Sequence, residues 1–182
     1  EIEEMDPHVS DTDAVRSSIG QGTNNYAPVQ LARYVTTIAN EGNCYDLTLV
    51  NEIKNIDGRT VYKSDNVPKN TVDLTDSQWA VIKQGMRQMV SEHTSPSALI
   101  NQINVNVAGK TGTAEEDTTR PDHALFVSFA PYENPEVSVT CVIPHGYTSG
   151  NAEELAGMVY AYMYDPDKLD TLDITGNNQR SD

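Results

Sequence analysis

The sequence predicts an α+β fold in which helices cover an antiparallel sheet and a β-hairpin projects from the body. Two strand-like runs, residues 123–130 and 137–143, are joined by the turn-forming sequence Pro-Tyr-Glu-Asn-Pro, which is typical of a hairpin. The first run is apolar on both faces, which indicates a central strand covered on both sides. A second hairpin is predicted by two short extended runs around Asp57-Gly58. Segments with apolar residues at helical spacing supply the covering layers.

The first helix is predicted from Pro28 to about Asn40, with Gly42 as its C-terminal stop. Residues 1–17 before it are acidic and show no period, so we expect an entry segment in loop conformation. At 182 residues the chain is long enough for one domain with a core. We therefore expect one domain, residues 18–165, between that entry segment and a polar tail.

Residues 47–63 form the predicted projecting hairpin, with Asp57-Gly58 as a two-residue turn. The next helix begins with the capping-box pair Thr75 and Gln78 and continues to about Glu92. Its apolar stripe is typical of a core-facing helix: Trp79, Ile82, Met86, Met89 and Val90.

A short helical turn is expected between residues 97 and 102, followed by a strand indicated by the alternating Val105 and Val107. The last helix is predicted to start near Asn151, capped by that side chain, with Glu153 and Glu154 in its first turn. Beyond Pro166, residues 166–182 are rich in Asp and Asn, and we expect a disordered tail.

Composition excludes some classes of function. The chain has 12 basic and 27 acidic residues, and a net charge of −15 disfavours nucleic acid and anionic membrane surfaces. No Cys or His pair has metal-ligand spacing, so no metal and no cofactor are expected. Whether Cys44 and Cys141 pair is left open. No apolar run approaches the roughly 20 residues that a membrane-spanning helix needs.

The run Gly109-Lys110-Thr111-Gly112-Thr113-Ala114 is the strongest candidate site. It directly follows the strand predicted at Val105 and Val107, so it presents a lysine, two hydroxyls and a glycine along an open strand edge. That arrangement suits the binding of a carboxylate beside a reacting carbonyl. Lys-Thr-Gly is one of three motifs of penicillin-binding proteins and serine β-lactamases. An ordinary polar edge strand is the plainer interpretation.

Several segments together, in order, resemble the C-terminal half of a class B penicillin-binding protein transpeptidase domain. The resemblance spans roughly residues 15–165. It rests on Ser-Ile-Gly-Gln-Gly at 18–22 with Tyr-Ala-Pro-Val-Gln-Leu-Ala at 26–32, the hairpin at Asp57-Gly58, Gln-Gly-Met-Arg-Gln-Met-Val at 84–90, Lys-Thr-Gly-Thr-Ala-Glu at 110–115, and Ala-Leu-Phe-Val-Ser-Phe-Ala-Pro at 124–131 followed by Asn-Pro-Glu-Val at 134–137. Ala27 stands where the family usually has threonine.

The resemblance implies a peptidoglycan D,D-transpeptidase that cross-links stem peptides ending in D-Ala-D-Ala and binds β-lactam antibiotics. It implies that Lys110 lies near the nucleophile and that Thr111 and Thr113 offer hydroxyls to the terminal carboxylate. The N–H of Thr113 is expected to donate to the oxyanion, and Gly112 leaves room for the acyl group. Lys110 and Thr113 are thus the expected catalytic residues, and Thr111, Gly112 and Thr113 the substrate-binding residues. Such a protein acts on the outer side of the bacterial membrane, anchored by an N-terminal segment.

The nucleophile of this family lies in Ser-x-x-Lys, and no serine of the chain has a lysine three positions on. We therefore expect the reactive serine and the family's Ser-x-Asn to lie upstream of Glu1, and the chain to be inactive by itself. Ser64-Asp65-Asn66 spells Ser-x-Asn but lies just past the projecting hairpin. Ser149-Gly150-Asn151 is a similar coincidence at a helix start.

Gly109-Lys110-Thr111 is similar to the end of a phosphate-binding loop, but Asn104 replaces the first glycine and no helix is predicted after the lysine. A non-catalytic sensor or peptide-binding module of the same superfamily stays open. In the family the sheet has five strands, so we also expect the far edge of residues 137–143 to drive self-association or to pair with a local segment such as residues 1–16.

Overall fold

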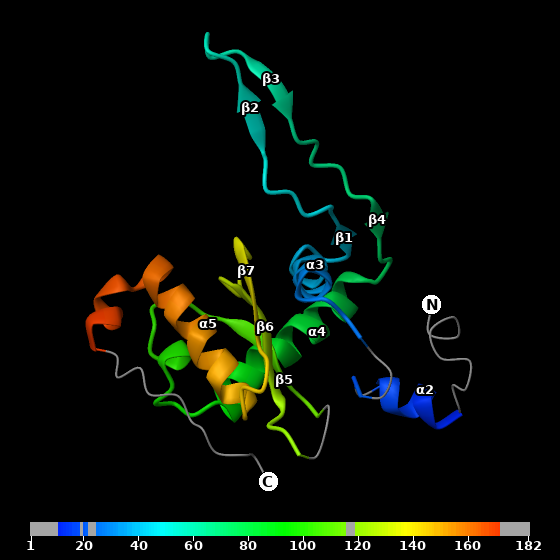
Figure 1. Ribbon diagram of the computed structural model, residues 1–182, viewed down its shortest axis with the longest axis vertical. Helices are drawn as coiled ribbons and strands as arrows, with labels where there is room; N and C mark the ends of the chain where they lie inside the picture. The colour runs from blue at the N-terminus through cyan, green and yellow to red at the C-terminus, as the bar shows by residue number, and fades with distance from the viewer. Residues whose placement is uncertain (1–10, 19, 22–24, 116–118, 172–182) are drawn as a thin grey trace.

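The computed structural model describes residues 11–18, 20–21, 25–115 and 119–171. The expectations for residues 1–10 and 172–182 lie outside these ranges. The elements form a sheet with helices on both sides, from which a long two-stranded arm extends (Figure 1). The described part of the chain holds no helix that is both long and apolar enough to cross a membrane.

The sheet has three antiparallel strands in the order β5-β6-β7. They are β5 (Ala108–Ala114), β6 (His123–Ala130) and β7 (Val137–Ile143). The hairpin predicted between the last two is confirmed, and β6 is central, as its two apolar faces predicted. The outer edges of β5 and β7 carry no further strand among the described residues.

One face of the sheet packs against α5 (Ser149–Tyr164) and the other against α3 (Pro28–Ala39) and α4 (Asp76–Gln88). Phe126 points into the core under α5, and Phe129 into the core under α3 and α4. These two residues lie three positions apart on β6, so they project to opposite faces. The two cores fix the position of β5 from both sides.

The starts of the helices follow from local chemistry. Pro28 opens α3, and Gln30 accepts a hydrogen bond from the N–H of Ala27. Thr75 and Gln78 form the predicted capping box of α4. That helix continues as a π-helical turn, η1 (Met89–His93), and a 3₁₀ turn, η2 (Leu99–Asn101), matches the predicted helical turn.

Three boundaries differ from the sequence-based expectations. The entry segment is not all loop, because α2 (Asp11–Ser18) is helical. Helix α5 is capped by Thr148 and not by Asn151, whose amide instead donates to the carbonyl of Gly146 at 2.8 Å. The start of the expected disordered tail is a 3₁₀ helix, η3 (Pro166–Thr171).

The arm consists of two short sheets, β1 (Asn43–Cys44) with β4 (Asn70–Thr71), and β2 (Glu52–Lys54) with β3 (Thr60–Lys63). The second pair is the predicted hairpin. Its turn is wider than the expected two residues, because the side chain of Asn55 accepts hydrogen bonds from the N–H groups of Asp57 and Arg59.

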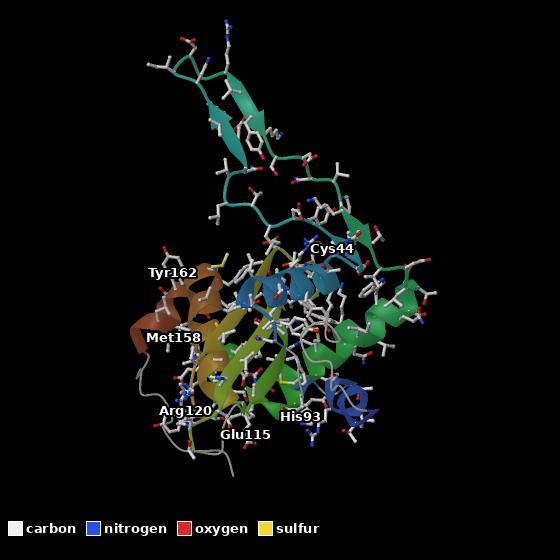
Figure 2. The ribbon with its side chains drawn as sticks, turned by 45° about the vertical axis from the view of Figure 1, so that its right-hand side comes forward. Cys44, His93, Glu115, Arg120, Met158 and Tyr162 are labelled. Carbon is white, nitrogen blue, oxygen red and sulfur yellow. The ribbon has the colours of Figure 1, made fainter. Side chains whose placement is uncertain are left out.

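The base of the arm is tied to α3. Arg33 forms an ion pair with Asp46 at 3.2 Å, and its Nε donates to Cys44 Sγ at 3.1 Å. Figure 2 labels Cys44 at this junction. A hydrogen bond from Thr37, and next the contact with Arg33, lower the pKa of the Cys44 thiol. Cys44 and Cys141 are both free.

Candidate active site

Strand β5 begins at Ala108, so the Lys-Thr-Gly run lies inside the strand, and the expected strand at Val105 and Val107 is wrong. The turn before β5 is held by α4. Arg87 donates to the carbonyl of Val107 at 3.1 Å and to the side chain of Asn106 at 2.9 Å. The burial of Val107 and Ala108 in the two cores and the hydrogen bonds from Arg87 together fix where the strand starts.

The motif residues divide between the two faces of the sheet. Lys110 and Gly112 pair with Val127 and Leu125, on the face of α3 and α4. Thr111 and Thr113 pair with Phe126 and Ala124, on the face of α5. Side chains of a strand alternate between faces, and cross-strand partners share one. The side chains of the motif therefore do not share one face, and what all the motif residues present together is the backbone along the outer edge of β5.

Lys110 is exposed, and its ammonium group turns back to donate to the carbonyl of Thr111 at 2.8 Å. The hydroxyl of Thr111 faces Met89 Sδ, at 4.0 Å. Both residues border a groove of about 1050 Å³ between β5, residues 93–102 and the start of α5. Lys110 is therefore available to an incoming charged group.

One acidic side chain of this groove is buried. Glu153 on α5 is only 8% exposed and accepts a hydrogen bond from the hydroxyl of Thr94. Burial raises the pKa of its carboxyl group, against the opposite effect of the Thr94 hydroxyl. The expected role of Glu153 in the first turn of the helix is wrong, since the first turn contains no acidic residue.

The two glycines of the run differ in their surroundings. A Cβ on Gly109 would lie 2.5 Å from Cζ of Phe126, whereas a Cβ on Gly112 would meet only Leu125 Cβ at 3.4 Å, an ordinary contact. Packing therefore requires glycine at position 109 and does not require it at 112. The expectation that Gly112 leaves room for a bound group is consistent with this difference.

Gln21 is a neighbour of the site that the sequence analysis did not assign. Its side-chain amide donates to the carbonyl of Thr113 at 3.2 Å, across 92 positions of the chain. The sequence feature that could have indicated Gln21 is the Gly-Gln-Gly run at 20–22, which was interpreted only as part of the resemblance to the family. The ring centroids of His123 and His145 lie 4.8 Å apart.

The structure separates only one of the two Ser-x-Asn sequences from the groove. Ser64 follows β3 on the arm, whereas Ser149 starts α5 and lines the groove together with Lys110. Figure 2 places Glu115, next to the end of β5, at the end of the molecule away from the arm. The phosphate-loop interpretation is wrong, because Gly109-Lys110-Thr111 is strand and not a loop before a helix. Within the described ranges, no three His, Cys, Asp or Glu side chains gather as a metal site.

The sequence and the fold are similar to those of known proteins. The family model "Penicillin binding protein transpeptidase domain" matches residues 4–163. Penicillin-binding protein 2B of Streptococcus pneumoniae is 34% identical over 142 residues, which cover 72% of this chain and 21% of that protein. Peptidoglycan D,D-transpeptidase MrdA of Acinetobacter baumannii is 27% identical over 166 residues, which cover 82% of this chain and 24% of that protein.

Solved structures of penicillin-binding proteins also match this chain. Penicillin-binding protein 2B from S. pneumoniae strain R6 matches with a TM-score of 0.73 at 29% identity, over 92% of this chain and 29% of that chain. The imipenem acyl-enzyme complex of penicillin-binding protein A from M. tuberculosis matches with a TM-score of 0.69 at 27% identity, over 81% of this chain and 33% of that chain.

The chain belongs to the transpeptidase domain family of penicillin-binding proteins. Its helix-covered antiparallel sheet is the α+β fold of that family. The chain spans about a fifth to a quarter of the length of the curated relatives it matches.

Proposed function

We propose that the chain forms the carboxylate-receiving wall of a serine D,D-transpeptidase that cross-links peptidoglycan stem peptides outside the cell membrane. The observation that carries the proposal is the exposed Lys110 on β5, whose outer edge pairs with no other strand in the part of the chain that the structure describes. An edge strand offers backbone donors and acceptors to an extended peptide, and the ammonium group offers a charge-assisted hydrogen bond to its terminal carboxylate. The relatives named as D,D-transpeptidases support the same chemistry.

The proposal assigns a role to each motif residue. Lys110 stabilises negative charge near the reacting carbonyl, and the hydroxyls of Thr111 and Thr113 contribute polar contacts to the substrate carboxylate. The N–H of Thr113 is one oxyanion donor. The attacking serine belongs to a Ser-x-x-Lys segment that this chain does not contain, so the chain by itself does not turn over substrate.

Labelling with a fluorescent penicillin tests the proposal. We expect a polypeptide that extends upstream of Glu1 and includes Ser-x-x-Lys to become labelled, and the 182-residue chain to stay unlabelled. In the longer polypeptide Lys110→Ala should slow acylation by about 10- to 100-fold, the effect of one lost hydrogen bond to a charged group. Lys63→Ala, on the exposed strand β3, is the matched control and should leave the rate unchanged.

A second candidate is a non-catalytic peptide-binding module of the same superfamily. The observation that favours it is that no serine of the chain has a lysine three positions on. The same experiment separates the two functions. Failure of the longer polypeptide to become acylated, together with binding of peptides that end in D-Ala-D-Ala, would favour the module.

A further inference from the structure

The outer edge of β5 already carries two hydrogen bonds to side chains of its own chain. The carbonyl of Thr111 accepts from Lys110, and the carbonyl of Thr113 accepts from Gln21. Carbonyl groups two residues apart on a strand point to the same side. Both acceptors therefore lie where a strand added to this edge would place its N–H groups.

The two donors differ in origin. Lys110 belongs to β5 itself, whereas Gln21 comes from the segment between α2 and α3. The turn that ends α2 fixes the backbone of Gln21: its N–H donates to the carbonyl of Arg16, and the N–H of Gly20 donates to Ser17, both at 3.0 Å. Gly20 has a φ of +81°, a conformation that glycine adopts readily. The two hydrogen bonds of Gly20 and Gln21 to α2 thus place the amide of Gln21 against the motif strand.

We propose that Gln21 determines which peptides dock on β5, because an extended peptide must displace its side-chain amide to reach the carbonyl of Thr113. This inference rests on the proposed function, in which the substrate adds to β5 as a further strand. The bond from Gln21 is exposed and 3.2 Å long, so a backbone N–H of the peptide replaces it at little cost. A ligand that brings no N–H to this position breaks the bond without replacing it.

Kinetics of the longer polypeptide, not yet exposed to penicillin, test the proposal. Removing the competing donor in Gln21→Ala should lower KM for a peptide ending in D-Ala-D-Ala by about 2- to 10-fold, the equivalent of one ordinary hydrogen bond. Gln21→Met, which keeps the length of the side chain and cannot donate, should act in the same direction. Gly20→Ala should do so more weakly, since no atom lies within 4 Å of the added Cβ and only the turn is strained. The control is Gln84→Ala, an exposed glutamine on α4.

A second readout does not depend on turnover. In the ¹⁵N-labelled chain, adding acetyl-Lys-D-Ala-D-Ala should move the side-chain amide resonance of Gln21 toward its position in free solvent. An N-methylated peptide that lacks the donating N–H should require higher concentrations for the same shift.

The outcomes are distinguishable. If the longer polypeptide is not acylated but the peptide still shifts the Gln21 amide, the proposed function fails and the role of Gln21 stands. If acylation occurs while the Gln21 resonance stays in place, or if Gln21→Ala leaves KM unchanged or raises it, the role of Gln21 is wrong.

Discussion

The aromatic ring of Phe126 lies against the backbone of Gly109, with Cζ 2.5 Å and Cε2 2.8 Å from where a Cβ on residue 109 would be. Both residues lie on the α5 face of the sheet, and Phe126 is fully buried. The ring cannot shift without disturbing the core. Gly109→Ala should therefore reduce the free energy of unfolding by about 1–3 kcal/mol, measured by urea denaturation.

Gly85→Ala is the control for that substitution. Gly85 lies inside α4 and has open space around its Cβ position, so alanine should raise the free energy of unfolding by about 0.5–1 kcal/mol. Equal effects of the two substitutions would contradict the close packing of Phe126 on Gly109.

The hydroxyl of Tyr160 lies 3.0 Å from Ser128 Oγ in the core between α5 and the sheet. The hydroxyl of Ser128 also donates to the carbonyl of Val139, so in Tyr160→Phe the Ser128 hydroxyl keeps one of its two partners. We expect a loss of stability of about 1 kcal/mol, measured by thermal unfolding.

Burial raises the pKa of Tyr160, which the Ser128 hydrogen bond only partly offsets. The folded state therefore prefers the neutral phenol. This contribution to stability is complete below the pKa of the unfolded chain and is lost as the pH rises through the folded value. In an absorbance titration Tyr160→Phe should remove a phenol that ionises only with alkaline unfolding, and earlier ionisation of Tyr160 would contradict its burial.

Glu153 should make the stability of the fold depend on pH in the same direction as Tyr160 does. Because its pKa is raised in the folded chain, its contribution is complete below the pKa of the unfolded carboxyl group and decreases as the pH rises through the folded value. Glu153→Gln should therefore raise the unfolding temperature at pH 8 more than at pH 5, with the Thr94 hydrogen bond kept. A larger gain at pH 5 would contradict the prediction.

The outer side of α5 carries an exposed apolar stripe made of Leu155, Val159, Tyr162 and Met163. Figure 2 labels Met158 and Tyr162 on this helix. Among the described residues no strand pairs with the outer edge of β7, which belongs to the sheet that α5 covers. Helix α2, the described part of the expected covering segment, adds no strand to that edge. Exposed apolar surface beside an open strand edge favours association.

We therefore expect the 182-residue chain to self-associate in sedimentation velocity experiments, and Val159→Lys to shift it toward monomer. Val67→Lys, at an exposed position near the arm, is the control. A clean monomer at high protein concentration would count against self-association.

Much of the fold follows from periodicity and turn chemistry, because those signals are local. Pro28, the Thr75–Gln78 pair and the two-faced apolar pattern of residues 123–130 each depend on neighbours within a few positions. Helix α2 was not predicted because six of its eight residues are polar and the other two form no apolar stripe, although Gly20 after it is a common helix stop.

The candidate site was only partly predictable. The position of Lys110 on an edge strand was predicted from the motif, whereas the flanking pattern wrongly placed the strand at Val105 and Val107. The division of Lys110 and Thr111 between two faces follows from the strand period of two once the strand is known to start at Ala108. The contact between Gln21 and Thr113 joins residues 92 positions apart, and no local pattern encodes it. Likewise Thr148 and Asn151 can both cap a helix, and the turn at Gly146 decides between them.

Strands β2 and β3 stand away from the sheet, connected to the body through β1 and β4 (Figure 1). Their turn is stabilised within itself by Asn55, so its geometry does not depend on the core. The tip at residues 56–58 is therefore a suitable place to insert an affinity tag or a fluorophore, at a distance from Lys110. Such a handle would allow the protein to be immobilised with the motif strand facing the solution.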